Sequence, residues 1–428
     1  MVDKAREVAL KTLYKINNEG AYSNIALDEY LNANRSKLNN KDIGLISEIV
    51  YGVVTWKLTL DTIIQNYSKI KLKKISPWII NILRMGIYQI IFLDKIPKSA
   101  AVDESVNLAK RYGHKSSSGF VNAILRKVTV QDYENLFNIK DEIEKISKTE
   151  SMPVWIIKEL LKDNTVEETE IICKNLNLKP QLCIRVNNLK TNKEDLIKKL
   201  ENKNVECKQT EYEDFIILKN VKNLENFEEF QQGLFTVQNI SAGLTALLLE
   251  PKKGEYILDA CSAPGGKTTY IAELMENEGK IDAWDIYEHR LDLIEDNCKR
   301  LGVTIVNTKI QDATKPTEDK KYDKILLDVP CMGIGVINRK PDIKWQRSAE
   351  DIINITKTQI DILENCSKLL KDGGTLVYST CSILKEENEN IIEQFLKNHS
   401  NFKKEKILEI VPNEEYDGFF ICKLKKLK

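Results

Sequence analysis

Two cysteines occupy matching places in the second half of the chain. Cys331 ends the run 328–331 (DVPC), Cys381 lies in the run 379–382 (STCS), and an apolar stretch precedes each run. A thiolate can add to an electron-poor carbon and leave again, provided that its pKa is lowered or that a base lies near it. Either cysteine alone is more often a small buried residue than a catalyst. If both follow adjacent parallel strands, they favour nucleophilic catalysis.

A run of small residues, 261–267 (CSAPGGK), follows the apolar stretch 256–258 and precedes a helical pattern. Small residues let the backbone approach a ligand closely. Gly266 and Lys267 match the end of the phosphate-binding P-loop pattern, but Cys261 stands where that pattern requires its first glycine. The dinucleotide pattern G-x-G-x-x-G is absent. The run therefore predicts a ligand-binding turn of another kind, and the alternative is a simple tight turn between a strand and a helix.

Aspartates follow the strand-like stretches in step. Asp285 ends the stretch 281–286, roughly 20 residues past the turn, where a carboxylate can accept hydrogen bonds from both hydroxyls of a ribose. Asp312 ends the stretch 308–313 and is placed to meet the exocyclic amine of adenine. Each aspartate alone is more often a helix cap or a turn residue. Together with the turn of small residues they favour an adenosine-containing ligand.

A thiolate beside such a ligand suggests one reaction. Carbon 5 of cytosine is too electron-poor to take a methyl group directly, but addition of a thiolate to carbon 6 makes carbon 5 nucleophilic. Asp328, if it holds or shares a proton, could hydrogen-bond the ring nitrogen and stabilise the adduct. Loss of the carbon 5 proton then expels the thiolate, and the base must leave any stack to reach the pocket. The residues alone do not decide which cysteine attacks.

The elements that would position these residues change character along the chain. Residues 1 to about 130 show helical spacing of apolar residues and predict a small bundle, and the charged stretch 130–151 is expected to be a linker. Between about 180 and 235, short apolar runs alternate with charged helical ones, which indicates a small α/β module. From about 235 onward, strands and helices alternate on a larger scale. This predicts a parallel sheet covered on both faces, with ligands at the carboxyl ends of its strands.

The composition is that of an ordinary soluble protein of two or three domains. The 428 residues are 42% hydrophobic and 30% charged, and the formal net charge is zero, so contact with a nucleic acid would depend on local clusters. Two basic clusters are candidates, with solvated helix faces as the alternative: Lys69, Lys71, Lys73 and Lys74; and Lys110, Arg111, His114, Lys115, Arg126 and Lys127. Nine scattered cysteines and three separated histidines favour free thiols and argue against a metal site. The mixed charge of the first residues indicates no signal peptide, and a cytoplasmic protein is expected.

The three motifs resemble those of a known family. The runs 261–267, 328–331 and 379–382 are similar to motifs of the RNA 5-methylcytosine methyltransferases. The whole chain is similar to the bacterial ribosomal RNA small subunit methyltransferase B group (Sun or Fmu) of the RsmB/NOP family. Further matches are 235–238 (FTVQ), 341–345 (PDIKW) and 417–420 (DGFF). The first part resembles the antitermination factor NusB, through 5–6 (AR) and 119–126 (GFVNAILR).

The resemblance implies three domains. They are a NusB-like helical RNA-binding domain over 1–130, a small α/β RNA-contacting module over 150–235, and an S-adenosylmethionine-dependent methyltransferase domain over 236–428. The last would have the class I, Rossmann-like fold with a seven-stranded, mostly parallel sheet. Its substrate would be one cytosine of 16S ribosomal RNA. A monomer without a metal and without a membrane partner is expected.

The resemblance also implies roles for single residues. Cys381 would attack carbon 6, and Cys331 would assist product release, the reverse of the arrangement in DNA cytosine methyltransferases. Lys267 and Asp328 would lie at the catalytic centre. The methyl donor would be held by Cys261, Ser262, Ala263, Pro264, Gly265, Gly266, Lys267, Asp285, Asp312 and Asp328. The sequence differs from the usual pattern of the family at three positions, Val329, Met332 and Asn239. These differences would affect the fine shape of the pocket.

Three other functions are compatible with parts of the sequence. A transfer RNA cytosine methyltransferase would share the chemistry, but the NusB-like part points to the ribosomal branch. A catalytically silent RNA-binding assembly factor would not need the intact cysteines. DNA methylation would call for a separate target-recognition segment, and the sequence offers none.

Overall fold

The structure is a computed structural model that describes residues 2–219, 221, 224–317 and 319–428. The chain divides into two compact units. The first, which we call the helical unit, comprises residues 1–177 and 337–348. The second, the sheet unit, comprises residues 178–336 and 349–428.

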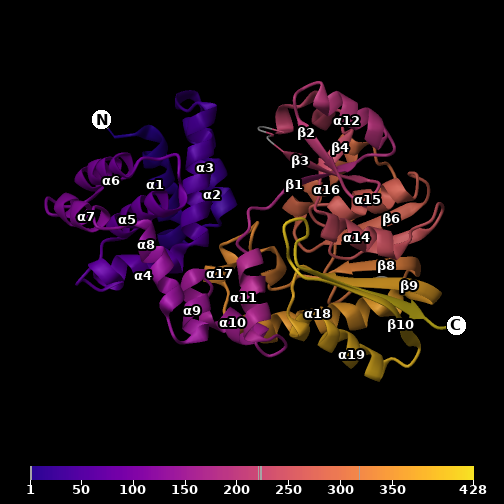
Figure 1. Ribbon diagram of the computed structural model, residues 1–428. Helices are drawn as coiled ribbons and strands as arrows, with labels where there is room; N and C mark the ends of the chain where they lie inside the picture. Colours follow the sequence, from indigo (N-terminus) through magenta and orange to yellow (C-terminus); the bar gives the residue numbers. More distant parts are fainter. Residues whose placement is uncertain (1, 220, 222–223, 318) are drawn as a thin grey trace. The chain divides into compact units, whose positions relative to one another are not determined.

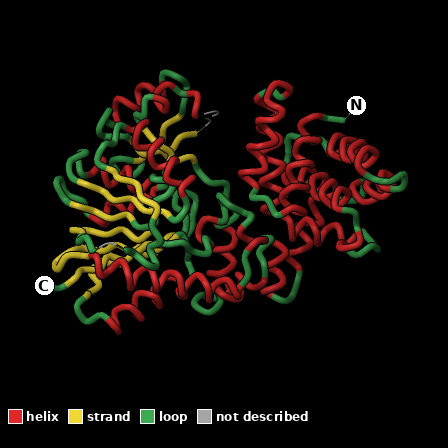
Figure 2. The backbone as a smooth tube through the Cα atoms, turned by 180° about the vertical axis from the view of Figure 1, so that it is seen from behind, coloured by secondary structure: helices red, strands yellow, loops and turns green. Residues whose placement is uncertain are grey.

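The helical unit consists of helices and loops throughout its described residues (Figure 2). Its first α-helix is capped at the N-terminus by Asp3, whose side chain accepts a hydrogen bond from the Arg6 amide, and at the C-terminus by Gly20, whose φ of 76° is left-handed. The apolar helix α5 contacts α1, α3, α4, α6 and α7, and so forms the centre of the core. The bundle predicted from the helical spacing is confirmed. Its helices are α1 (Lys4–Glu19), α2 (Ser23–Asn34), α3 (Asn40–Thr55), α4 (Lys57–Tyr67), α5 (Pro77–Phe92), α6 (Lys98–Tyr112) and α7 (Ser117–Leu125).

The stretch expected to be a linker is largely helical instead. It forms α8 (Val130–Glu134) and α9 (Glu142–Thr149), followed by α10 (Val154–Leu160) and α11 (Val166–Asn175). Helix α9 buries Ile146 completely, and the Lys148 carbonyl accepts a hydrogen bond of 2.6 Å from the Thr59 hydroxyl on α4. The charged residues of this stretch therefore belong to an amphipathic helix, and the linker expectation was wrong because the few apolar residues lie on one face.

Among the described residues, no single helix is both long and apolar enough to cross a membrane. Helices α3 and α4 meet the criterion only as a pair bent by 77°. Their apolar residues, such as Val50 and Ile63, are fully buried in the core of the helical unit.

A segment from the second half of the sequence also belongs to the helical unit. Residues 337–348, with the short helix α17 (Ile343–Gln346), lie between two strands of the sheet unit in sequence. Asp342 accepts hydrogen bonds from the amide and the hydroxyl of Ser23, at 3.1 and 2.6 Å, and the Trp345 ring donates to the Val54 carbonyl at 2.7 Å. Lys344 is buried and donates to Asn177 at 2.6 Å. The motif 341–345 thus anchors this segment in the helical unit.

Lys344 makes the stability of the helical unit depend on pH. Burial lowers the pKa of Lys344 to about 7. Between that pH and the ordinary pKa of lysine the unfolded chain binds the proton and the folded chain does not, so the free energy of unfolding rises with pH. We expect the stability of the protein, measured against that of Lys344→Met, to rise by about 1.4 kcal/mol per pH unit between pH 7.5 and 9. Denaturant unfolding of both proteins at several pH values measures this slope.

The matched control for this prediction is Lys41→Met on α3, because Lys41 is exposed. Its stability difference from the parent protein should not change over the same pH range. A constant difference for Lys344→Met would contradict the buried, neutral state of this amine.

The sheet unit contains a small antiparallel sheet with the order β2-β3-β1-β4. The strand–helix–strand pattern predicted for this region is confirmed by β1, α12 and β3. Strand β2 escaped prediction because its residues are polar and mostly exposed. The elements are β1 (Leu182–Val186), α12 (Lys193–Glu201), β2 (Glu206–Gln209), β3 (Phe215–Lys219), α13 (Glu228–Gln231) and β4 (Phe235–Val237).

The large sheet has seven strands in the order β10-β11-β9-β8-β5-β6-β7. Strands β5 to β9 are parallel to one another, and β11 lies antiparallel between β9 and β10. Helices α14, α15 and α16 cover one face, and α18 and α19 cover the other (Figure 1). The predicted seven-stranded, mostly parallel sheet is confirmed. Its elements are α14 (Ile240–Leu249), β5 (Tyr256–Asp259), α15 (Gly266–Leu274), β6 (Lys280–Asp285), α16 (Glu288–Leu301), β7 (Val306–Ile310), β8 (Tyr322–Asp328), α18 (Ala349–Cys366), β9 (Leu370–Thr380), α19 (Glu389–Asn398), β10 (Phe402–Ile410) and β11 (Phe419–Lys426).

Arg185 fastens the small sheet to helix α15. Its side chain is completely buried, forms an ion pair of 2.7 Å with Glu273, and donates a hydrogen bond of 2.8 Å to the Gly266 carbonyl. The guanidinium also lies 4.5 Å from the ring centre of Tyr270. A buried charge with this many partners fixes the first turn of α15, where the small-residue run ends.

Candidate active site

The run of small residues forms the turn between β5 and α15. Gly265 has a φ of 95°, and a Cβ there would lie 3.1 Å from the Ile294 backbone of α16. At Gly266, a Cβ would have only the Gln238 side chain within 4 Å, at 3.8 Å. The turn is therefore tight on its inner side and has room for a ligand beside Gly266.

Asp259, the last residue of β5, is fully buried at this turn. Its Oδ2 accepts a hydrogen bond of 2.7 Å from Thr268, whereas its Oδ1 has no hydrogen-bond partner among the described residues. Burial raises the pKa of Asp259 to about 7. An unpartnered buried carboxylate oxygen at a strand end indicates a polar ligand there.

Asp285 and Asp312 follow the next two strands of the sheet. Asp285 ends β6 and is buried, and its Oδ1 accepts a hydrogen bond of 3.0 Å from the Tyr287 amide. Asp312 is exposed and lies just beyond the end of β7 at Ile310, so the expectation that it ends the strand was wrong by two residues. Its Oδ1 accepts from the amide and the hydroxyl of Thr314, at 2.9 and 2.7 Å. Each carboxylate is thus held in one orientation by the loop that follows it.

The two cysteines come together at the same edge of the sheet. Strands β8 and β9 are parallel neighbours that align Asp328 with Ser379, and the sulfurs of Cys331 and Cys381 lie 2.9 Å apart as free thiols. The Cys381 carbonyl also accepts a hydrogen bond of 3.0 Å from the Gly335 amide. The prediction that both cysteines follow adjacent parallel strands is confirmed.

Lys267 and Asp328 form an ion pair beside the thiols. The ammonium lies 2.7 Å from Asp328 Oδ2, and Ser379 donates a hydrogen bond of 2.9 Å to Oδ1. Burial alone would lower the pKa of Lys267, but the charge and hydrogen bond of Asp328, with a smaller contribution from the Cys381 thiolate, raise it. The amine therefore stays protonated and carries its charge toward both Asp328 and Cys381.

The two thiols share one hydrogen bond, which either sulfur can donate. The hydrogen bond to Cys381, which Cys331 can donate only while it is protonated, and burial together raise the pKa of the Cys331 thiol well above its usual value. Because only a thiolate attacks, the member of the pair that keeps its proton can serve as the S–H donor to the other.

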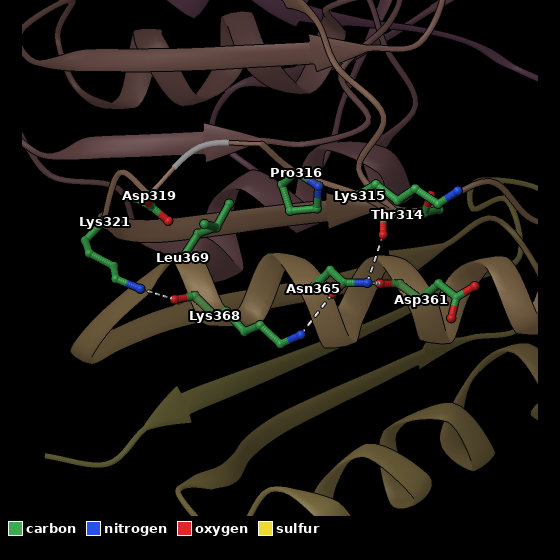
Figure 3. A pocket seen from close by; sticks show the side chains of 9 residues that line it. All are labelled: Thr314, Lys315, Pro316, Asp319, Lys321, Asp361, Asn365, Lys368 and Leu369. Atoms are coloured by element: carbon green, nitrogen blue, oxygen red, sulfur yellow. Dashed lines mark hydrogen bonds between the residues drawn. The ribbon is translucent and has the colours of Figure 1, made fainter.

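A pocket of about 560 Å³ lies elsewhere in the sheet unit, and Figure 3 shows its lining. It is formed by residues between β7 and β8 and along α18, including Thr314, Lys321 and Asn365. These residues bond one another or nearby backbone: Asn365 donates to the Thr314 carbonyl at 2.8 Å, and Lys368 donates to Asn365 at 2.9 Å (Figure 3). None of the predicted site residues lines this pocket. In the described part of the chain, no group of three or more His, Cys, Asp or Glu could hold a metal ion.

Known proteins match this chain over nearly its full length. Residues 246–425 match the family of the 16S rRNA methyltransferase RsmB/F, residues 3–130 the NusB family, and residues 152–225 the ferredoxin-like domain of RsmF/B-like methyltransferases. The chain is 35% identical to the probable ribosomal RNA small subunit methyltransferase B of Bacillus subtilis, over 98% of each protein. It belongs to the RsmB/F methyltransferase family. A relative of the same name in Synechocystis is also 35% identical, over 99% of each protein.

Solved structures share the fold of this RsmB/F methyltransferase. The crystal structure of PH0851 covers 100% of both chains, with 28% identity and a TM-score of 0.83. NSun6 from Pyrococcus horikoshii, solved with SFG, covers 65% of this chain and 99% of its own, with 26% identity and a TM-score of 0.59.

The methyl donor of an RsmB/F methyltransferase is S-adenosylmethionine, and the residues of this chain fit it. The open space beside Gly266 admits a ligand against the backbone of the turn. The orphaned Oδ1 of Asp259 can accept a hydrogen bond, and carboxylates at successive strand ends suit the hydroxyls and the amine of an adenosine.

Sequence reasoning found most of this site but not all of it. The structure brings Cys331, Cys381, Asp328 and Lys267 into contact with one another or with a shared neighbour. Asp259 was missed, although its place at the end of a strand before the small-residue run was a usable signal. Ser379 lies inside the run 379–382, but no pattern in the sequence assigns it a role.

Proposed function

We propose that this protein methylates carbon 5 of a cytosine in 16S ribosomal RNA, with Cys381 as the nucleophile and Cys331 as an aid to product release. The observation that carries the reaction type is the meeting of two thiols, 2.9 Å apart, beside the Lys267–Asp328 ion pair. A methyltransferase whose target atom is already nucleophilic needs no thiol. Two thiols at the carboxyl edge of the sheet favour a reaction in which the target carbon must first be activated by nucleophilic addition.

The proposed reaction begins when Cys381 adds to carbon 6 of the ring. A sulfur–carbon bond forms, and the electrons of the double bond between carbons 5 and 6 become available at carbon 5. S-adenosylmethionine supplies the electrophilic methyl group that carbon 5 accepts. A base then removes the carbon 5 proton, the double bond forms again, and the Cys381 thiolate is expelled.

Three features of the chain support these roles. The raised pKa of Cys331 keeps that residue a thiol, and a thiol can donate a hydrogen bond to the departing Cys381 sulfur. The ammonium of Lys267 is positioned to stabilise negative charge on Cys381. Asp328 accepts a hydrogen bond from the Lys267 ammonium. A proton shared by this pair could form a hydrogen bond with the ring nitrogen of the adduct.

In this proposal the methyl donor lies along the turn after β5. The residues that would hold it are those of the small-residue run 261–267, with Asp285, Asp312 and Asp328. Asp259 joins this set because of its unpartnered oxygen. Asp285 would accept hydrogen bonds from the ribose, and Asp312 from the adenine amine.

Ribosomal RNA is the proposed substrate because of the family and of the basic surface. The relatives are named ribosomal RNA small subunit methyltransferase B, and the first 130 residues match the NusB family. Every member of the two basic clusters of the helical unit is exposed or half-exposed, as phosphate contacts require. The protein would act in the cytoplasm as a monomer, on naked RNA or an early assembly intermediate.

The substrate is tested by offering three nucleic acids. The protein is incubated with labelled S-adenosylmethionine and unmodified 16S RNA, transfer RNA or DNA, and the methylated base is mapped. We expect label at carbon 5 of a cytosine in 16S RNA alone. Label in transfer RNA alone would overturn the proposed substrate, and label on another atom would overturn the reaction.

A further inference from the structure

Two consecutive residues, Glu387 and Asn388, contact the loops that carry the two cysteines. They lie where the 3-10 turn Lys385–Glu387 meets α19. Both are buried, with exposed fractions of 0% for Glu387 and 3% for Asn388. Buried polar side chains are retained where their hydrogen bonds fix a structure that apolar residues could not.

Glu387 holds the loop of Cys331 with the help of Gln359 on α18. Its Oε2 accepts a hydrogen bond of 2.8 Å from the amide of Met332, directly after Cys331. Gln359 donates to the same oxygen at 3.0 Å and to the carbonyl of Pro330, directly before Cys331, at 2.9 Å. The backbone on both sides of Cys331 is thus tied to one buried polar pair.

Asn388 holds the loop of Cys381 in the same manner. Its Oδ1 accepts a hydrogen bond of 2.6 Å from the hydroxyl of Thr380, directly before Cys381. Its Nδ2 donates to the carbonyl of Ser382, directly after Cys381, at 3.0 Å. The backbone between Glu387 and Asn388 therefore connects two clamps, each around one cysteine.

We propose that Glu387 and Asn388 are positioning residues that act as a pair, with Glu387 fixing the Cys331 loop and Asn388 the Cys381 loop so that the two thiols meet. The two cysteines follow different strands, and both lie in loops beyond the last paired residues Asp328 and Thr380. The sheet alone therefore sets the distance between the loops but not the direction of the thiols. The inference deepens the proposed function, since it assigns the device that brings its two thiols together.

The first test measures how readily the thiols meet, without RNA or methyl donor. The full-length protein is treated with the mild oxidant diamide, and formation of a Cys331–Cys381 disulfide is followed by mass spectrometry of the linked peptides. We expect rapid linkage in the parent protein and linkage at least about tenfold slower in Glu387→Ala and in Asn388→Ala, because the thiols lose their fixed approach. Matched controls are Glu393→Ala and Asn390→Ala, at solvent-accessible positions of α19, which should link at the parent rate.

Isosteric variants keep the test valid if the alanine variants fail to fold. Glu387→Gln retains an oxygen for the Met332 amide and should link at nearly the parent rate. Asn388→Asp retains the acceptor for Thr380 but loses the donor to the Ser382 carbonyl, and should link more slowly. Parent-like linkage in folded Asn388→Asp, or in either alanine variant if it folds, would overturn the proposal.

The second test asks whether positioning limits the reaction. With 16S RNA in a single turnover, we expect Asn388→Asp to form the covalent adduct about 100-fold more slowly while its Kd for S-adenosylmethionine stays unchanged. An unchanged rate of adduct formation would overturn the functional part of the inference. The diamide measurement needs no substrate, so it still decides the positioning if Cys381→Ala proves active and the proposed function fails.

Discussion

Replacement of the proposed nucleophile, Cys381→Ala, is expected to abolish methyl transfer while leaving the fold and the binding of S-adenosylmethionine intact. Without a thiolate on carbon 6, carbon 5 of cytosine stays too electron-poor to accept a methyl group. Loss of a covalent nucleophile costs an enzyme about 10,000-fold or more in rate, which is more than the loss of a single hydrogen bond. Alanine removes one sulfur from a half-buried position, so the packing cost is small.

The measurement is single-turnover transfer of labelled methyl to 16S RNA, with calorimetry for the binding of S-adenosylmethionine. Cys207→Ala, which removes a half-buried thiol from the small sheet, is the matched control and should keep full activity. Methyl transfer by Cys381→Ala at a rate within tenfold of the parent would refute Cys381 as the nucleophile. A larger loss in Cys331→Ala than in Cys381→Ala would assign the attack to the other cysteine.

The sequence predicted which residues meet at the carboxyl edge of the sheet because the local motifs and the fold agree there. In a parallel sheet every strand carries its motif to the same edge, so residues that end separate strands must meet. This rule is enough to place Asp328, Cys331 and Cys381 together. It does not decide which cysteine attacks, since both occupy equivalent places in the pattern. The structure adds their proximity, with the two sulfurs 2.9 Å apart, but this shared contact is the same for both cysteines.

What the sequence could not predict depends on contacts between distant residues. Glu387 acts through a buried hydrogen bond to a loop 55 residues away. In the sequence, a glutamate followed by an asparagine is typical of any polar turn, so the pair indicated no such role. Residues 337–348 follow a strand of the sheet unit but pack in the helical unit, which no local pattern could indicate. The stretch 130–151 was misjudged from its charge alone, because one buried face of an amphipathic helix needs few apolar residues.

The proposed release role gives Cys331→Ala an outcome unlike that of any other substitution. The Cys331 thiol lies 2.9 Å from the Cys381 sulfur and can donate a hydrogen bond to it as the bond to carbon 6 breaks. Removal of one donor to a developing negative charge slows a step by about 100-fold or more. We therefore expect methyl transfer to carbon 5 in the first turnover, followed by a protein–RNA adduct that persists through denaturing electrophoresis.

The label in this adduct decides at which step Cys331 acts. With labelled S-adenosylmethionine the trapped adduct should contain the methyl label, because attack and transfer come before release. An adduct without label would place Cys331 before methyl transfer, and free methylated RNA at the parent rate would show that release does not need it. The double variant Cys331→Ala/Cys381→Ala should form no adduct, since the sulfur that bonds carbon 6 is gone. An adduct in the double variant would mean that a third nucleophile attacks, and neither proposed role would stand.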